Sequence, residues 1–414
     1  AEISKRSWFV YARFKAFFSS VYWKIFTMKK RSERCSYLLV CSVFFLVINA
    51  ALGTETDNNW LVIDGQSDVC WQRDVEIRGN VSLSASCIAQ GGVHIRESNV
   101  HLNCNGGEIN LDDKVRTGIE IDSGGKVVEN ISIRNCIIRN SKFQGIYIGW
   151  LAPDRSKARA LTKDQLYKFT PHNILIENVN ILTPGSSGVY IDDFSSNVNL
   201  VNIEVSDARA MAIYFEHSSR DNVLKNSRIY RNGKGFKREA VSIDSSSNNV
   251  ILNNEFLGNS FGAIFVYRNC SEHYQRSPDQ VVRWMSSDGN SISGNHISGS
   301  RNAIWLASRQ SMPLQNAECG NGYYAEGKYT EDSAKHNVVS DNKIYDSEFG
   351  VLVEDDFNFV KNNEFYDIGD TAIRVGTPIR NRYLNKPVIG IVVTGNVQDG
   401  NPVDAIFKWG SFRD

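Results

Sequence analysis

Acidic side chains end three short apolar segments that follow one another along the chain. The segments read GVYID, AIYFE and AVSID, and their last residues are Asp192, Glu216 and Asp244. If the three segments lie side by side as strands, neighbouring carboxyl groups start about 5 Å apart at the backbone. Carboxyl groups this close compete for protons, bind a cation or meet basic partners, and each of these arrangements occurs in catalytic sites.

Further side chains with acid, base or charge-stabilising chemistry stand next to these acids. An acid and an imidazole follow directly, and the next two strand-like segments, AIFVY and AIWLA, bring a phenol and two guanidinium groups. Imidazole and phenol groups transfer protons, and guanidinium groups stabilise developing negative charge. Ordinary solvated turn residues are the competing interpretation. The candidate catalytic residues are Asp192, Asp193, Glu216, His217, Asp244, Tyr267, Arg268 and Arg309.

Aromatic side chains stand two residues before this column of candidates in several segments. Because side chains alternate between the faces of a strand, the two columns should point to the same, solvent-facing side. Aromatic rings on a wet face offer flat platforms for sugar rings, although they can also serve only to stabilise a sheet. The candidate substrate-binding residues are Tyr147, Tyr190, Tyr214, Phe265 and Trp305.

Two longer segments between the repeats are rich in basic residues and follow the same kind of strand. Both should therefore overhang the same face, and their charge favours an acidic or sulfated glycan, although a basic segment can also be merely solvated. Residues 150–171 hold Arg155, Lys157, Arg159, Lys163 and Lys168 with a short helix-like stretch, and residues 271–289 hold His273, Arg276 and Arg283.

An internal repeat must position all these residues. Nine short segments alternate apolar and other residues, from GIEID at residues 118–122 to AIRVG at residues 372–376, and helical periodicity is absent from them. Pairs of Asn (once Asp) five residues apart recur between the segments, and their closest spacings are 21 and 24 residues. A repeat of this length with β-branched strands and Asn-rich turns predicts a parallel β-helix, in which stacked Asn side chains bond to one another. The pairs are Asn130/Asn135, Asn173/Asn178, Asn197/Asn202, Asp221/Asn226, Asn249/Asn254, Asn290/Asn295, Asn337/Asn342 and Asn358/Asn363.

With this repeat over roughly residues 60–400, the chain resembles the pectate-lyase-like right-handed β-helix superfamily. The resemblance implies an all-β, right-handed parallel β-helix of about ten coils with loop insertions. It says less about chemistry, because the same fold serves lyases, hydrolases, epimerases and phage adhesins. Size, leader and organisation also resemble the secreted β-helix lyases encoded with Vibrio-type biofilm-matrix exopolysaccharide genes.

The first 53 residues are expected to lie outside the fold. Residues 1–27 form an upstream or unstructured leader, and residues 28–53 have the basic start, apolar stretch and small terminal residues of a signal peptide. An uncleaved membrane anchor is the alternative. Residues 54–414 then form one β-helix domain, with a cap over 54–95, coils over 96–400 and a tail over 401–414. We expect a secreted, extracellular or periplasmic monomer without a stable membrane anchor.

Charge and cysteine counts fit this division. The chain has 46 basic and 46 acidic residues, but nine of the basic and two of the acidic ones precede residue 54, which leaves a net charge of −7. No nucleic-acid partner is expected from such a balance. Six cysteines remain, an even number for an oxidising compartment. Cys104 and Cys136 each follow a repeated Asn and should stack, as a disulfide or as two thiols. Disulfides between Cys70 and Cys87 and between Cys270 and Cys319 would complete the set.

Cleavage of an acidic polysaccharide by β-elimination is the preferred activity. His217 or Tyr267 could remove the proton beside the sugar carboxylate, and Arg268 and Arg309 could neutralise that carboxylate. A Ca²⁺ ion held by Asp192, Asp193, Glu216 or Asp244 would do the same, and no other cofactor is expected.

Two alternatives stay open. Asp192-Asp193 followed by Glu216-His217 resembles the paired acids and histidine of polygalacturonases, which would make the protein a glycoside hydrolase. That family's Asn-x-Asp coil and Arg-x-Lys motif are absent here, and Gly149 stands in the preceding coil. The Asp-Pro-His-Asp signature of β-helical mannuronan epimerases is also missing. A non-catalytic glycan-binding or adhesin β-helix would need the aromatic residues but not the cluster of acids, histidine and arginines.

Overall fold

The computed structural model describes residues 60–151, 154–192, 194–216, 218–269, 284–308, 323–324, 329–330, 334–377, 380 and 386–407. The leader and signal peptide predicted for residues 1–53 lie outside this part. Within it, no helix is long and apolar enough to cross a membrane.

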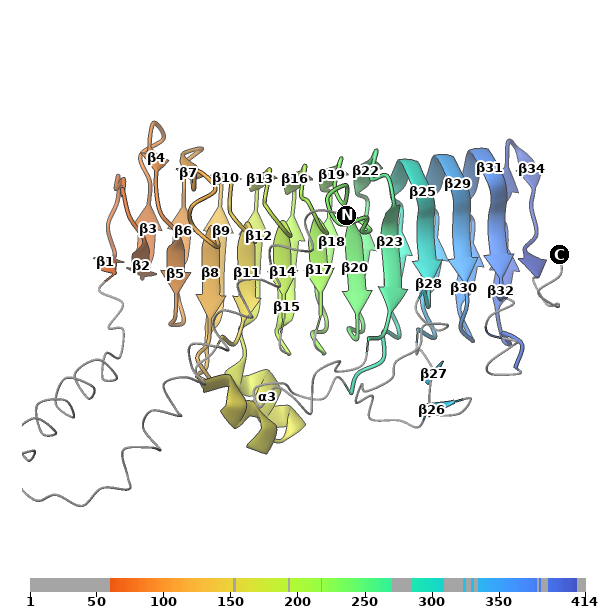
Figure 1. The fold of residues 1–414 in the computed structure, drawn as a ribbon, viewed down its shortest axis with the longest axis horizontal. Coiled ribbons are helices and arrows are strands. Elements are labelled where there is room, and N and C mark those ends of the chain that lie inside the picture. Colours follow the sequence, from red (N-terminus) through yellow and green to blue (C-terminus); the bar gives the residue numbers. More distant parts are fainter. Residues whose placement is uncertain are drawn as a thin grey trace, which may run out of the picture. The chain divides into compact units, whose positions relative to one another are not determined.

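The described chain winds into successive coils whose strands pair in parallel with those of the next coil (Figure 1). Each coil contributes strands to three sheets, named I, II and III here. Sheet I comprises β1 (Leu61–Asp64), β2 (Val75–Arg78), β5 (Val93–Ile95), β8 (Ile119–Asp122), β11 (Ile146–Gly149), β14 (Val189–Ile191), β17 (Ile213–Phe215), β20 (Val241–Asp244), β23 (Gly262–Tyr267) and β35 (Ile406–Phe407).

Sheet II follows sheet III in each coil. Sheet II comprises β4 (Ile88–Ala89), β7 (Glu108–Asn110), β10 (Ile137–Arg139), β13 (Asn180–Leu182), β16 (Glu204–Ser206), β19 (Arg228–Tyr230), β22 (Glu255–Leu257), β33 (Val397–Gln398) and β34 (Asn401–Pro402). Sheets I and II merge in three long strands, β25 (His296–Leu306), β29 (Lys343–Val353) and β31 (Glu364–Val375), which run through both.

Sheet III has 11 strands. These are β3 (Asn80–Ser82), β6 (His101–Asn103), β9 (Glu129–Arg134), β12 (His172–Glu177), β15 (Ser196–Val201), β18 (Val223–Lys225), β21 (Val250–Leu252), β24 (Ser291–Ser293), β28 (Val338–Ser340), β30 (Phe359–Lys361) and β32 (Val392–Thr394). Outside the coils, β26 (Tyr323–Tyr324) and β27 (Tyr329–Thr330) form an antiparallel pair. The prediction of an all-β, right-handed parallel β-helix is confirmed.

The core lies inside the coils and follows the alternation read from the sequence. The residues predicted to point inward on sheet I are all buried, with exposures of 0–1%. They are Ile119, Ile146, Val189, Ile213, Val241, Ile264, Ile304, Val351 and Ile373. Because β-branched side chains pack well on a pleated surface, one such residue per coil builds a continuous apolar stack.

The repeated Asn residues form two sets of columns where the sequence suggested one. Up to Asp221/Asn226, both members of each pair have positive φ and stand on the surface of the turns, apart from the half-buried Asn135. From Asn249/Asn254 onward, both members are buried. The positive-φ position is then held by the residue before each Asn, for example Asn248 and Asn253. Asn serves the first set because it tolerates the left-handed region, and the second because its amide satisfies buried backbone groups.

The cysteine predictions hold where the structure describes them. Cys104 and Cys136 form a disulfide with a Cα separation of 4.8 Å, and Cys70 and Cys87 form another at 5.6 Å. The second bridge joins two turns at the N-terminal end of the coils. Cys270 and Cys319 lie outside the described residues.

Candidate functional site

The two outward columns on sheet I have the register predicted from the sequence. In the first, called the aromatic column, Tyr190 pairs with Tyr147 on one side and with Tyr214 on the other. In the second, called the acidic column, Asp192 and Glu216 directly follow the paired strands β14 and β17, and Asp244 ends the next strand, opposite Tyr267. Parallel pairing therefore brings residues from segments far apart in sequence into one line.

The expectation that the aromatic column is exposed is wrong for most of its rings. Tyr147 and Tyr214 are each 7% exposed and Phe265 is 3% exposed, whereas Tyr190 and Trp305 are half-buried. The rings cover one another: Tyr147 stacks on Tyr190 at 5.7 Å between centroids, and Tyr190 meets the edge of Tyr214 at 5.0 Å. Such contacts stabilise the sheet and leave only part of each ring surface accessible.

The tyrosine hydroxyl groups point to the acids of the neighbouring column. Tyr147 donates to Asp192 Oδ2 at 3.1 Å, and Tyr190 donates to Glu216 Oε2. Tyr214 lies 3.0 Å from Glu216 Oε1 and 2.8 Å from Asp244 Oδ2. All three acids are at least 96% buried. We call these six residues, Tyr147, Tyr190, Tyr214, Asp192, Glu216 and Asp244, the tyrosine–carboxylate ladder.

The single hydroxyl proton of Tyr214 lies between two acids of this ladder, Glu216 and Asp244. A phenol donates one hydrogen bond, so Tyr214 can serve Glu216 or Asp244 at one time, but not both. Asp244 has further donors, because it accepts from the Asn269 backbone N–H at 2.7 Å and from the Asn269 amide at 2.8 Å. Tyr190, Glu216, Tyr214 and Asp244 are thus connected by hydrogen bonds across three successive coils.

A second network adjoins the ladder and was missed from the sequence. Tyr267, which is fully buried, donates to Glu239 at 2.9 Å and accepts from Arg238 at 2.8 Å. Ser242 of the aromatic column also donates to Glu239. Arg238 and Glu239 stand just before Ala240 and β20, in a turn whose sequence resembles other charged loops and carries no signal that indicates them.

Burial and charge set the protonation of this network. Burial raises the pKa of the Tyr267 phenol well above its ordinary value, and the charge of Glu239 raises it further. Burial opposes ionisation of Glu239, but the charge and hydrogen bonds of Arg238 and the Ser242 hydroxyl together outweigh burial and lower the pKa of that carboxyl. Tyr267 is therefore a neutral hydrogen-bond donor held between two charges, an arrangement suited to support and poorly suited to a base.

The remaining predicted catalytic residues are only partly described. Arg268 is 5% exposed and follows Tyr267 at the end of β23. Asp193, His217 and Arg309 lie outside the described residues. The same is true of the basic residues of segment 271–283.

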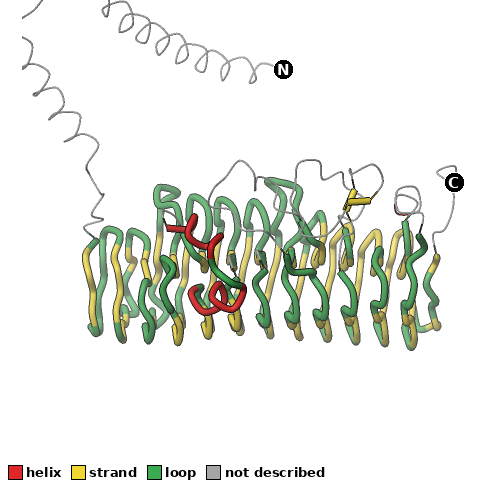
Figure 2. The backbone as a smooth tube through the Cα atoms, turned by 90° about the horizontal axis from the view of Figure 1, so that it is seen from below, coloured by secondary structure: helices red, strands yellow, loops and turns green. Residues whose placement is uncertain are grey.

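The first basic insertion folds against the turns that carry the acids. It forms the 3-10 helix η2 (Asp154–Ala160) and the helix α3 (Lys163–Phe169), which begins at a Thr162–Gln165 capping box. Trp150, Leu166 and Phe194 form its small core, and the Tyr167 hydroxyl donates to the Ser218 backbone carbonyl at 2.8 Å. Figure 2 shows both helices lying over the coils. Since Phe194 and Ser218 each stand two residues after a ladder acid, the insertion borders the ladder as predicted.

Cationic side chains accompany this contact. The Arg220 guanidinium lies 3.8 Å from the centre of the Tyr167 ring, and the Lys163 ammonium lies 3.7 Å from that of Trp284. Both interactions hold positive charge next to the turns that follow β14 and β17.

Another acidic member of the column, Glu354, lies farther along the coils. Burial raises the pKa of Glu354 to about 7, although Arg374, at 3.8 Å, opposes this change. Burial likewise raises the pKa of neighbouring Asp355 to about 6. Arg380 contacts Asp355 at 3.3 Å and Asp356 at 2.8 Å, so the cluster is held together by buried charges.

Among the residues that the structure describes, no group of three or more His, Cys, Asp or Glu side chains could hold a metal ion. The ladder carboxylates accept hydrogen bonds from phenol, amide and hydroxyl donors. A Ca²⁺ ion at Asp192, Asp193, Glu216 and Asp244 stays a prediction, because Asp193 is outside the described part.

Family models match two parts of this right-handed β-helix. Residues 155–277 match the right-handed beta helix region, and residues 263–381 match the periplasmic copper-binding protein NosD. The described residues of the second range do not fit a copper site, because His296 and His336 stack on Tyr345 and Phe357 and no metal-binding group forms there. A comparison with curated proteins finds no match.

Similar solved structures have low sequence identity. The tailspike protein of E. coli bacteriophage HK620 in complex with a pentasaccharide has 12% identity and a TM-score of 0.47, covering 86% of this chain and 63% of that one. The Azotobacter vinelandii mannuronan C-5 epimerase AlgE4 A-module has 13% identity and a TM-score of 0.45, covering 79% of this chain and 80% of that one. The chain thus spans less than two thirds of the tailspike protein.

Proposed function

We propose that the protein cleaves an acidic polysaccharide by β-elimination and that Tyr190 and Glu216 transfer the proton. The observation that carries this proposal is the geometry of the pair. Tyr190 is the half-buried tyrosine of the ladder, and its hydroxyl donates to the buried carboxylate of Glu216. A phenol that can pass its proton to a carboxylate, and that solvent can reach, is able to act as a base toward a substrate.

The proposed reaction conserves its protons. Glu216 takes the hydroxyl proton of Tyr190, and the phenolate oxygen removes the proton next to the sugar carboxylate. The electron pair of that C–H bond forms a carbon–carbon double bond, and the glycosidic C–O bond breaks. Tyr190, which now carries that proton, gives a proton to the leaving oxygen, and Glu216 returns its proton to Tyr190, so both groups regain their starting state. Arg268, with Arg309, His217 and Asp193 as predicted neighbours, would neutralise the sugar carboxylate and adjust the proton path.

Positive charge beside the ladder supports an acidic substrate. Lys163 and Arg220 lie against aromatic rings at the border of the insertion, and Lys157, Arg159 and Lys168 belong to the same insertion. Clustered cations attract polyanions over about a Debye length, roughly 8 Å at physiological salt, even though the chain after residue 53 has a net charge of −7. We also propose an extracellular or periplasmic location, a monomer and a biofilm-matrix exopolysaccharide as substrate.

Hydrolysis is the second candidate, and one observation favours it. Glu216 and Asp244 both approach the hydroxyl of Tyr214, so two carboxyl groups of neighbouring coils stand close enough to share one phenol. Glycoside hydrolases use two carboxyl groups flanking the scissile bond, one as acid and one as base or nucleophile.

Product analysis separates these activities. Purified protein is incubated with alginate, polygalacturonate, hyaluronan and acidic bacterial exopolysaccharides, and the fragments are analysed by mass spectrometry and ultraviolet absorbance. The proposal predicts fragments with an absorbing, unsaturated terminal sugar. Fragments heavier by one water molecule and without that absorbance would show hydrolysis instead. Binding without shortening of any polymer would leave a glycan-binding protein and overturn both enzymatic proposals.

A further inference from the structure

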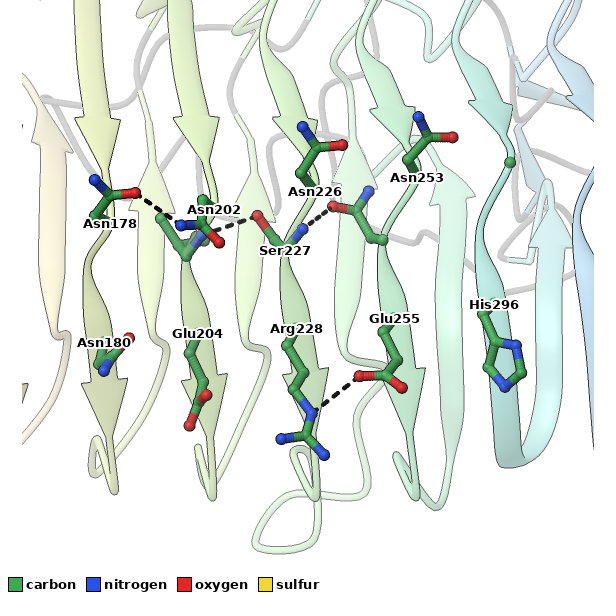
Figure 3. A pocket seen from close by; sticks show the side chains of 13 residues that line it. Asn178, Asn180, Asn202, Glu204, Asn226, Ser227, Arg228, Asn253, Glu255 and His296 are labelled. Carbon is green, nitrogen blue, oxygen red and sulfur yellow. Dashed lines mark hydrogen bonds and ion pairs between the residues drawn. The ribbon is translucent and has the colours of Figure 1, made fainter.

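A polar groove runs along the coils at the turns that join sheet III to sheet II (Figure 3). Its volume is about 900 Å³, and it crosses five successive turns, those at Asn178, Asn202, Asn226, Asn253 and Gly294. In each coil the chain passes from sheet III through this turn to sheet II and only then to sheet I. The groove therefore lies at a different corner of the coil from the tyrosine–carboxylate ladder.

The groove lies where the Asn columns change from surface to buried positions. The surface column runs from Asn135 through Asn178 to Asn202, with amide-to-carbonyl distances of 3.1 and 2.7 Å. One residue later in the coil, the buried column begins with Ser227, which donates its backbone N–H to Asn254 Oδ1 at 2.9 Å. The change of column is thus complete within two coils.

After this change, two exposed Asn side chains no longer belong to a hydrogen-bonded column. Asn226 and Asn253 keep the left-handed turn position, with φ of 53° and 55°, and both are exposed. Neither side chain has a hydrogen-bond partner within the described part of the chain, whereas Asn178 and Asn202 bond to each other. Figure 3 shows both amides standing apart from the buried column. Each offers donors and an acceptor to a molecule in the groove.

Along the other wall of the groove, acidic and basic side chains alternate, and the last side chain is an imidazole. Glu204, Arg228 and Glu255 stand on neighbouring strands of sheet II, and Arg228 pairs with Glu255 at 3.0 Å. His296 follows on β25 and stacks on Tyr345 at 4.8 Å between centroids. Tyr345 belongs to the next coil, and His296 itself lines the groove.

We infer that this groove is a second glycan-binding site and takes an uncharged, hydroxyl-rich stretch of a polysaccharide chain. Free amides and a paired acid and guanidinium both donate to and accept from sugar hydroxyls, and the imidazole ring gives one sugar a flat contact. The pairing of Arg228 with Glu255 makes the groove unsuited to a polyanion. The choice of a glycan rests on the proposed function, but the site itself is independent of the ladder.

Affinity electrophoresis tests this inference on the whole protein. Native gels contain galactomannan, glucomannan or mixed-linkage glucan as neutral probes, or polygalacturonate as the charged probe. At least one neutral probe should retard the protein. The variant Asn226→Gly/Asn253→Gly removes both amides and keeps a residue that accepts positive φ, and His296→Ala removes the ring. The double amide variant should bind the retarding probe about thirtyfold more weakly and His296→Ala about fivefold more weakly, since each lost contact contributes roughly 1 kcal/mol.

Matched controls keep the result distinct from the proposed catalysis. Asn362→Gly alters the same type of exposed turn, with φ of 56°, outside the groove and should leave retardation unchanged. Tyr190→Phe should also leave retardation by neutral probes unchanged, while it affects cleavage. The inference is overturned if no neutral probe retards the protein, if the groove variants are retarded as strongly as the unaltered protein, or if Tyr190→Phe abolishes retardation. Failure of cleavage with retention of neutral binding would contradict the proposed function alone.

Discussion

The hydroxyl of Tyr147 occupies the space that a side chain at Gly149 would fill. A Cβ atom at residue 149 would lie 2.6 Å from that oxygen, closer than real Cβ contacts. The same hydroxyl donates to Asp192 in the next coil. Gly149 stands in the acidic column at the position where the polygalacturonase pattern is absent. Because Gly149 has no side chain, the Tyr147 hydroxyl can reach the neighbouring acid.

Gly149→Ala should therefore displace the Tyr147 hydroxyl and weaken its hydrogen bond to Asp192. We expect a loss of about 1–3 kcal/mol in the free energy of unfolding, because a methyl group is forced into a filled space. Chemical denaturation measures this loss, and polysaccharide cleavage should fall with it. Gly369→Ala is the control, since its nearest neighbour would be an ordinary contact at 3.7 Å. Equal stability of the two variants would contradict the assigned packing.

Stability should decline as pH rises from about 4 to about 8. Burial raises the pKa of Glu354 from 4.5 to about 7 and that of Asp355 from 3.8 to about 6. The folded state then binds more protons than the unfolded state in this range, so the free energy of unfolding decreases with rising pH. The Glu354 contribution is on the order of 3 kcal/mol. The denaturation midpoint should depend less on pH in Glu354→Gln than in the unaltered protein. In Asp367→Asn, which replaces an exposed acid, the pH dependence should be unchanged. A stability that increases over this range would refute the assignment.

Removal of Arg238 should destabilise the protein through the charge that it leaves behind. Glu239 is 2% exposed and is paired with Arg238 at 3.1 Å. A buried carboxylate without its partner costs about 3–5 kcal/mol, so Arg238→Met should lower the unfolding free energy by that amount. The double variant Arg238→Met/Glu239→Gln should recover a large part of it. If the double variant is as unstable as the single one, the pair acts through packing and not through charge.

Cleavage of an acidic polysaccharide should weaken with added salt. Exposed basic residues of the insertion attract the polymer at long range, and salt screens this attraction. KM should rise several-fold between low and physiological ionic strength, while kcat changes little. Lys163→Gln/Lys168→Gln should raise KM at low salt and reduce its salt dependence, whereas Lys361→Gln, in β30 of sheet III, should not. A KM that is independent of salt in every variant would remove the support for an acidic substrate.

The sequence predicts the sheet register well because local alternation and the repeat determine it together. A slip of one residue would turn every inward Ile or Val outward, so the pairing of Tyr190 with Tyr214 follows from the pattern alone. The stacking of Cys104 on Cys136 follows from the same repeat.

Other features depend on contacts that no local pattern contains. The rings were expected in solvent, but Ala210 and Met211, from the turn before β17, pack on Tyr214. The Arg238–Glu239 pair is hidden in a turn whose sequence resembles any charged loop. The repeated Asn pairs move from surface positions to buried positions along the chain. Because the five-residue spacing within each pair stays the same, the spacing could not predict this change.

The most direct test of the proposed function compares two tyrosine–glutamate pairs of the same kind. Tyr190 donates to Glu216 on sheet I, and Tyr230 donates to Glu204 on sheet II, in both cases from a half-buried phenol. Rates of unsaturated-product formation from the acidic polysaccharide that the protein cleaves are measured for Tyr190→Phe and Tyr230→Phe. We expect a loss of at least about a hundredfold in kcat for Tyr190→Phe and a rate near that of the unaltered protein for Tyr230→Phe. Equal rates for the two folded variants would contradict it.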